Sequence, residues 1–178
     1  WSPDGRWFVV SYIAHRRDPY TDIGIVSAEG GTIHPVTESG YMSGSARWAM
    51  DGQAILFHSE RYGMRSHASW GSQDDAFLAF LTQDAYDRFR LSPEDYALLK
   101  EMEGKAAKTD GEAAGKKEGK KGKKSGKPGK KKDGGTDEEA AKEKAWEPDF
   151  DAVADRIVRL TPNSSDMGDA ILSKDGEN

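Results

Sequence analysis

The sequence predicts an all-β protein, an incomplete β-propeller of about two to three four-stranded blades, with a helical and disordered insertion. Three observations support this fold class: a segment that repeats along the chain, apolar runs short enough for strands, and a Lys-rich stretch that interrupts the repeat. A repeat of about 47 residues is typical of a four-stranded propeller blade. A β-sandwich has turn signals at similar spacing, but sandwiches seldom repeat their turn residues in register.

The repeat is marked by Asp-Gly pairs. A shift of 47 residues aligns residues 1–11 with residues 48–58, so that Trp falls on Trp and Asp-Gly on Asp-Gly. A shift of 124 brings a further set into register: Asp51-Gly52 with Asp175-Gly176, Thr37 with Thr161, and Gly44 with Gly168. Gly accepts positive φ and Asp bonds nearby amides, so these pairs predict tight turns between strands. A ring of carboxylates for cations is the less favoured interpretation.

Short runs rich in aromatic and branched residues predict the strands. The predicted strands are, in chain order, residues 7–10, 23–26, 33–37, 44–48, 55–57, 75–78 and 157–161. Trp7 and Trp48 are predicted to pack between blades rather than to form a ligand platform. The chain starts at Trp1 and stops in a turn-like sequence, so we expect it to be a piece of a longer parent protein.

The third copy of the repeat is 77 residues late. Six extra residues fall in the loop 61–74, and 71 more lie between the third and fourth strands of one blade. We therefore predict blades over residues 1–82 and 146–178, a helical insertion over 83–103, and a disordered Lys/Gly/Glu-rich loop over 104–145. Ser92 and Pro93 suit the N-cap and first position of a helix, whereas the loop lacks the apolar residues needed to fold.

Charge is unevenly distributed along the chain. Residues 104–144 carry a net charge of +6, whereas residues 1–103 and 145–178 carry −6 and −5. The acidic body argues against nucleic-acid binding, and the basic stretch lacks the interleaved aromatic residues that stack on bases. No run is long and apolar enough for a membrane span. No cysteine is present, which excludes disulfides and Cys-ligated zinc.

Four segments carry a resemblance to a known family. Residues 1–6 (WSPDGR), followed by an apolar strand, resemble the TolB type of propeller repeat. Residues 59–65 (SERYGMR) and 67–75 (HASWGSQDD) are similar to bacterial homologues of tricorn protease, as are residues 155–166 behind a helical, Lys-rich insertion. The resemblance covers nearly the whole chain outside 104–144.

The resemblance implies a large serine peptidase with propellers, a PDZ domain and a later catalytic domain of the C-terminal processing type. None of that catalytic portion is present, so no residue here inherits a catalytic role. The implied function is a non-catalytic propeller segment that gates or docks peptides or unfolded polypeptides. A periplasmic location is implied, with a homo-oligomer of the parent protein as a further option. The alternative function is a TolB-like propeller that acts as a protein-binding adaptor in the cell envelope.

The loop 61–74 is the candidate peptide-binding segment. It offers Arg61, Arg65, His67 and Trp70, residue types that are favoured at binding hot spots. The alternative is that the loop anchors the inserted helix, through Trp70 packing and an ion pair of Arg61. The sequence predicts no metal site and no cofactor, because its four histidines lack the spacing of a helical zinc pair. It also contains no Gly-x-Ser-x-Gly nucleophile elbow.

Overall fold

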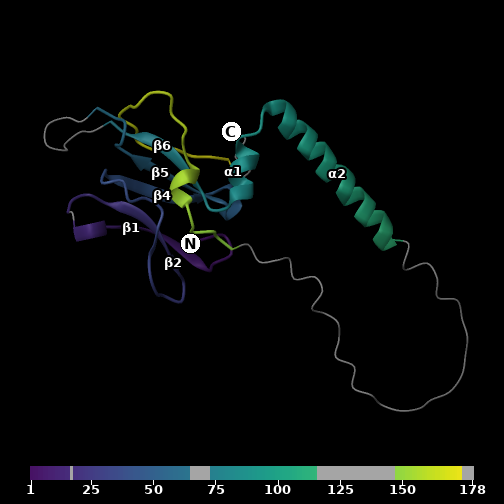
Figure 1. Cartoon of the computed structure of the whole chain (residues 1–178), viewed down its shortest axis with the longest axis horizontal. Helices are drawn as coiled ribbons and strands as arrows, with labels where there is room; N and C mark the ends of the chain where they lie inside the picture. Colours follow the sequence, from purple (N-terminus) through teal and green to yellow (C-terminus); the bar gives the residue numbers. More distant parts are fainter. Residues whose placement is uncertain (17, 65–72, 116–146, 174–178) are drawn as a thin grey trace, which may run out of the picture. The chain divides into compact units, whose positions relative to one another are not determined.

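The computed structural model describes residues 1–16, 18–64, 73–115 and 147–173. The chain divides into two compact units, one of residues Trp1–Phe89 with Pro148–Asn178 and the other of Arg90–Glu147. The first unit contains two antiparallel sheets, of three and four strands (Figure 1). This confirms the predicted all-β class.

The first sheet has the order β1-β2-β3, with β1 at Trp7–Tyr12, β2 at Asp22–Ser27 and β3 at His34–Pro35. Its middle strand is its most buried part, and a Cβ on Gly24 would overlap the Ile33 side chain. Strand β3 is shorter than the predicted strand 33–37. The N–H groups of Val36 and Thr37 both donate to the carbonyl of Ile23, so the ladder does not continue past Pro35.

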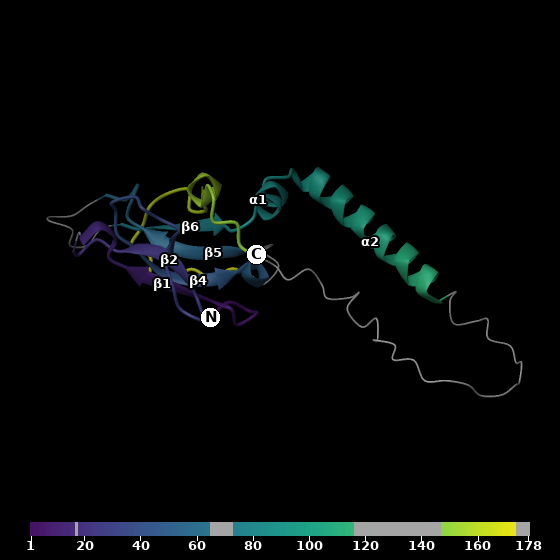
Figure 2. The ribbon, with the colours of Figure 1, turned by 60° about the horizontal axis from the view of Figure 1, so that its bottom comes forward.

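The second sheet is a meander of four strands in the order β4-β5-β6-β7 (Figure 2). Its strands are β4 at Ser43–Ala49, β5 at Ala54–Ser59, β6 at Asp75–Phe80 and β7 at Ile157–Arg159. Strands β6 and β7 pair with Leu78 opposite Val158, although the long insertion separates them in the chain. The insertion therefore lies between the third and fourth strands of one sheet.

Helices precede and follow the strands at several points. Helix α1 spans Gln83–Phe89, α2 spans Pro93–Gly115, and short 3-10 helices span Ala14–Arg16, Met50–Gly52 and Val153–Arg156. Ser92 Oγ accepts the N–H of Asp95, which caps α2 as predicted. Helix α2 continues twelve residues past the predicted limit at residue 103, into the loop predicted to be disordered. Ala, Lys and Glu in this stretch favour helix even without an apolar face. Residues 116–145 of that predicted loop lie outside the described residues.

The two ends of the insertion are held together in the first unit. The N–H of Asp149 donates to the carbonyl of Leu81 at 2.7 Å, and the buried Arg156 donates from Nε to the carbonyl of Phe80 at 3.1 Å. Arg156 Nη2 also donates to the carbonyl of Asp149 at 2.6 Å. The chain therefore leaves the sheet and returns to it at neighbouring points, which lets a long insertion leave the sheet intact.

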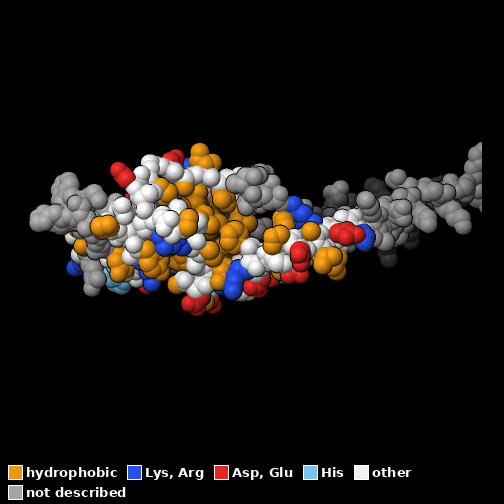
Figure 3. Space-filling model, turned by 90° about the horizontal axis from the view of Figure 1, so that it is seen from above, with side chains coloured by type: hydrophobic (Ala, Val, Ile, Leu, Met, Phe, Trp, Pro, Cys, Tyr) orange, Lys and Arg blue, Asp and Glu red, His pale blue; other side chains and the backbone are white. Residues whose placement is uncertain are grey.

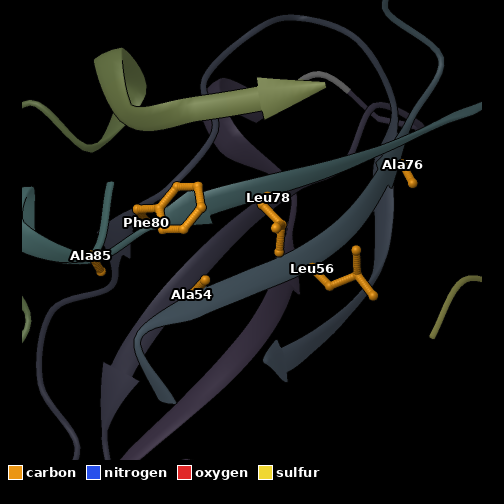
Figure 4. Close-up of a cluster of buried hydrophobic side chains, with 6 residues drawn as sticks. All are labelled: Ala54, Leu56, Ala76, Leu78, Phe80 and Ala85. Carbon is orange, nitrogen blue, oxygen red and sulfur yellow. The ribbon is translucent and has the colours of Figure 1, made fainter. Parts of the chain in front are cut away.

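One cluster of the hydrophobic core lies on one face of the second sheet (Figure 4), and Ile55, Phe57 and Ala79 are buried on the opposite face. Its buried members come from β5, β6 and α1, and they are Ala54, Leu56, Ala76, Leu78, Phe80 and Ala85. Side chains alternate along a strand, so the even-numbered residues of β5 and β6 share this face. Met167, Ala170 and Leu172 pack against it from the chain that follows β7. The space-filling view shows hydrophobic side chains gathered over the first unit (Figure 3).

Two of the predicted Asp-Gly turns are observed, at Asp4-Gly5 and Asp51-Gly52, and the third, Asp175-Gly176, lies outside the described residues. Asp4 Oδ1 accepts the N–H of Arg6 at 3.1 Å, and Gly5 follows with a φ of 72°. Gly52 has a φ of 92° and lies beside Pro3, whose ring a Cβ at Gly52 would crowd at 3.1 Å. Equivalent turns of the two sheets are therefore neighbours in space.

An Asp–Thr hydrogen bond with a buried Asp, here called the Asp–Thr clasp, occurs once in each sheet. In the first sheet, Thr37 Oγ1 donates to Asp22 Oδ1 at 2.9 Å. In the second sheet, Thr161 Oγ1 donates to Asp75 Oδ1 at 2.6 Å. Asp22 and Asp75 are the first residues of β2 and β6, which are the third strand of the repeat in their sheets. Thr37 and Thr161 follow β3 and β7, which are the fourth strand of the repeat. The two sheets thus share a polar contact as well as their turn residues.

Replacing Asp4 with Ala should lower the free energy of unfolding by about 1 kcal/mol at neutral pH. Burial raises the pKa of the Asp4 carboxyl, but hydrogen bonds from Ser2 and Arg6 outweigh it and lower the pKa from 3.8 to about 2. Since the folded-state pKa lies below the unfolded one, this stabilisation exists above pH 3.8 and is lost as the pH falls towards 2. Urea unfolding from pH 7 to pH 2 measures it. The exposed turn residue Glu29, replaced by Ala, is the control, and an equal loss in both variants would contradict the prediction.

Candidate functional site

A polar cavity of about 330 Å³ lies at one edge of the second sheet. Strand β4 begins there, β5 ends there and β6 begins there, because consecutive strands are antiparallel. The described residues that line the cavity are Thr21, Met42, Ser43, Gly44, Ser45, His58, Glu60, Asp74, Met167 and Gly168. The predicted binding loop 61–74 leaves and rejoins the sheet at this edge, since Glu60 precedes it and Asp74 is its last residue.

Three ionisable side chains line the cavity from one face of the sheet. His58 lies opposite Ala76 in the ladder between β5 and β6, and continuing that register places Glu60 opposite Asp74. All three residues have the parity of Leu56 and Leu78, so they belong to the same face as the core. The apolar core therefore ends at a polar cavity on this side of the sheet.

The carboxyl of Asp74 is held in an unfavourable environment for its charge. Burial raises its pKa, and the neighbouring carboxylates of Glu60, Asp166 and Asp75 raise the pKa further. His58 acts in the opposite direction. The net result is an Asp74 pKa above its usual value, which means that an added positive charge at this point would be stabilised.

Glu60 is held by the backbone of Met42, the residue before β4. It is 2% exposed, its Oε1 accepts the N–H of Met42 at 3.2 Å, and its own N–H donates to the carbonyl of Met42 at the same distance. Turning this buried carboxylate out to solvent would break its hydrogen bond with the Met42 N–H. Glu60 therefore forms a rigid acidic wall of the cavity.

Hydrogen bonds between segments hold the other walls. Thr21 and Ser43 exchange two bonds at 2.8 Å: the Ser43 N–H donates to the Thr21 carbonyl, and Thr21 Oγ1 donates to the Ser43 carbonyl. Asp74 and Ser165 exchange two backbone bonds, at 2.8 and 3.1 Å. The first pair joins the two sheets, and the second brings in the chain that follows β7. The cavity is therefore built from three segments that are distant in the sequence.

The structure describes one of the four predicted site residues. Arg61 is exposed, and its guanidinium carbon lies 5.4 Å from the centroid of the Tyr62 ring. Arg65, His67 and Trp70 lie outside the described residues. Arg61 is not among the residues that line the cavity. The structure thus places a candidate site next to the predicted loop but on residues of the sheet edge.

His58, Glu60 and Asp74 are not among the site residues predicted from the sequence. A signal was present, because His58 is a polar residue on the core face of an apolar strand and Glu60 and Asp74 flank the six-residue lengthening of the loop. Among the described residues, no three His, Asp or Glu side chains come together as metal ligands. His34 instead stacks on Phe150, with ring centroids 4.0 Å apart. Trp7 meets the same Phe150 ring edge-on at 5.2 Å, in agreement with its predicted packing role.

Comparison with protein-family models, with curated proteins and with solved structures finds no match to this chain. Within the described part of the chain, no helix combines the length and the apolar character needed to cross a bilayer.

Proposed function

We propose that this chain is a non-catalytic β-propeller segment of a tricorn-like serine peptidase, which gates or docks peptide substrates for a catalytic domain outside the chain. The observation that carries the proposal is the Asp–Thr clasp, which recurs at equivalent strand positions in both sheets. A repeated strand pattern with a repeated buried contact is the mark of a blade that is used more than once.

The second sheet supplies one complete unit of this repeat. Its four strands form a simple meander, and the first sheet contains the last three strands of the same pattern. Residues 167–172 then cover the face of the second sheet at the position that the first strand of a following blade would take. Successive blades of a propeller cover one another in this way, which supports a propeller over an isolated sandwich.

The docking part of the proposal is supported by the position of the cavity. Loops at the edge of a rigid β scaffold are common sites of binding. The cavity of the second sheet lies at the edge from which the lengthened loop 61–74 extends. The peptidase identity and the periplasmic setting come from the resemblance of residues 59–65, 67–75 and 155–166 to tricorn-like proteins.

A binding assay with an unfolded polypeptide tests this function. The 178-residue chain should bind fluorescently labelled, reduced and alkylated casein in a saturable manner, and it should leave that polypeptide uncleaved. Arg61→Ala should weaken the binding several-fold, because an exposed Arg offers donors to peptide carbonyls and carboxylates. Arg90→Ala, an exposed Arg of the other unit, is the matched control.

Either of two results would overturn the proposal. Cleavage of casein by the purified chain would make this segment catalytic. Failure to bind casein would remove the docking role, and binding of folded envelope proteins in its place would favour the TolB-like adaptor.

A further inference from the structure

One edge of the first sheet, the outer edge of β1, has no strand partner among the described residues. Strand β1 is at the end of the order β1-β2-β3, whereas β5, its counterpart after a shift of 47 residues, lies between β4 and β6. All six residues of β5 are buried, and none of the six residues of β1 is. Unpaired backbone groups along a strand edge are a template for pairing with a further strand.

The β1 backbone groups that face this edge follow from the pairing with β2. The N–H of Ala28, directly after β2, donates to the carbonyl of Arg6 at 2.8 Å, so the even-numbered residues of β1 face β2. Neighbouring residues of an antiparallel strand direct their backbone groups to opposite edges. Val9 and Ser11 therefore present their N–H and carbonyl groups at the open edge.

The first two residues of the chain already lie along one end of this edge. The N–H of Ser2 donates to the carbonyl of Trp7 at 2.7 Å, and the Trp1 ring lies on Phe8 with centroids 3.9 Å apart. A shift of 47 residues places both pairs on residue pairs of the β4–β5 ladder. The edge of β1 therefore suits a strand in the same register in which β4 pairs with β5.

Residues 167–172 have the sequence of such a strand. A shift of 124 residues aligns them with residues 43–48 of β4, so that a Gly and an Ala coincide. In the structure these residues belong to no strand, and no described residue exchanges a backbone hydrogen bond with them. The chain thus contains a β4-like segment without a ladder and a β5-like strand without its first neighbour.

The segment 167–172 is held by its side chains rather than by its backbone. Met167, Ala170 and Leu172 pack against the core of the second sheet, whereas Ile171 is 82% exposed. Side chains project from the faces of a strand and backbone groups from its edges. A second copy can therefore pair with the backbone of this segment while the three apolar side chains stay in the core.

We infer that residues 167–172 of one copy pair, as an antiparallel strand, with the open edge of β1 in a second copy of this chain. In the register of β4 and β5, Gly168 lies opposite Ser11 and Ile171 lies opposite Val9. Each copy offers one segment and one edge, so the contact is head-to-tail and continues until a ring closes or the assembly extends. A second copy is the occupant because its segment repeats β4 in register.

Sedimentation velocity of the 178-residue chain at increasing concentration tests the association. The apparent mass should rise from that of one chain to that of dimers and longer assemblies. Ser11→Pro removes an N–H at the open edge, where a sheet tolerates Pro, and Ile171→Pro removes one in the exposed segment. Each variant should associate at least about tenfold more weakly than the unaltered chain, because each loses a ladder hydrogen bond.

A mixture of the two Pro variants provides the sharpest comparison. Ser11→Pro keeps an intact segment and Ile171→Pro keeps an intact edge, so an equimolar mixture should form dimers that grow no further. Each variant alone should stay monomeric at concentrations where the mixture dimerises. Ser11→Ala and Ile171→Val are the matched controls, since they keep the backbone N–H and should associate like the unaltered chain.

A peptide of residues 166–172 with blocked ends tests the edge without any substitution in the fold. It should bind the unaltered chain, shift the amide NMR signals of Val9 and Ser11, and dissociate the assemblies. A peptide of the same composition in scrambled order is the control. Equal binding of both peptides would mean that the edge takes any extended chain, and it would overturn the assignment to a second copy.

Three further results would contradict the head-to-tail contact. They are a chain that stays monomeric at every concentration, association that survives both Pro substitutions, and a mixture of folded Pro variants that forms no dimer. Should a Pro variant fail to fold, the peptide comparison on the unaltered chain still decides. The association goes beyond the proposed docking function and does not depend on it, so loss of casein binding with association intact removes the docking role alone.

Discussion

Replacing Asp75 with Ala should lower the free energy of unfolding by about 3 kcal/mol. Asp75 is fully buried, and it accepts hydrogen bonds from Thr161 at 2.6 Å, from Ser164 at 2.8 Å and from Arg159 at 2.8 Å. Its removal would leave the Arg159 charge, which is 31% exposed, without its carboxylate and would leave two hydroxyl groups without an acceptor. Urea unfolding at pH 7 measures the loss.

The same group predicts a dependence on pH. Burial alone raises the pKa of the Asp75 carboxyl, but the hydrogen bonds from Thr161, Ser164 and Arg159 outweigh burial and lower the pKa. Because the folded-state pKa is below the unfolded value of 3.8, the stabilisation is complete well above pH 3.8 and is lost as the pH falls below it. The difference between the parent chain and Asp75→Ala should therefore shrink in acid.

The first sheet provides a matched control for this prediction. Asp22→Ala breaks the equivalent Asp–Thr clasp, but the Asp22 carboxyl accepts from Thr37 and, more weakly, from the Ser39 N–H, and no arginine of the described residues donates to it. Its loss should be smaller, about 1–2 kcal/mol. Equal losses at both positions would show that Arg159 contributes nothing, and a loss below 1 kcal/mol at Asp75 would contradict the view that the clasp stabilises the blade.

Replacing Phe80 with Ala should cost about 4 kcal/mol of unfolding free energy, the largest effect that we expect from a single core truncation. Phe80 is the last residue of β6 and is 0% exposed. Its ring centroid lies 4.9 Å from that of Phe89 and 5.8 Å from that of Tyr86. Its removal would leave a cavity that the sheet cannot close, because Leu78 and Ala54 are fixed by strand pairing on either side. The change would also remove the packing of the Phe80 ring against Tyr86 and Phe89 of α1.

Leu98→Ala is the control for the Phe80 variant. Leu98 is 59% exposed on α2, so its truncation should cost less than 1 kcal/mol. Thermal unfolding followed by near-ultraviolet circular dichroism measures both variants, and it also reports the loss of aromatic packing. A Phe80→Ala variant that unfolds at the parent temperature would show that the core on this face of the sheet does not carry the stability of the first unit.

The positions of most strands along the chain were predictable from the sequence, because turn residues and apolar runs are local signals. Asp-Gly pairs select a turn through the left-handed backbone of Gly, and a short apolar run such as Ile55–Phe57, with aromatic and branched residues, suits a buried strand. The fourth strand of the second sheet could be assigned despite the insertion, since Thr161 keeps its register with Thr37. The end of α2 was mispredicted, because a polar Ala- and Lys-rich stretch gives no apolar periodicity from which to judge helix length.

The candidate site was much less predictable. The Arg and Trp content of the loop 61–74 favoured it as the binding segment, and of its four candidate residues the structure describes Arg61 alone. The cavity instead depends on residues that pairing brings together from the end of β5, the start of β6 and the chain after β7. Such proximity is a property of strand register, which no single segment encodes.

The sequence by itself determined the all-β class, the Asp-Gly turns and the position of the insertion within one repeat. These features depend on the conformational preferences of individual residues and on a register that the chain repeats. The tertiary structure alone decided that His58, Glu60 and Asp74 line a shared cavity and that Asp22 and Asp75 each hold a threonine that follows the neighbouring strand. Those contacts join segments separated by long stretches of chain, so their energies exist only once the sheets have formed.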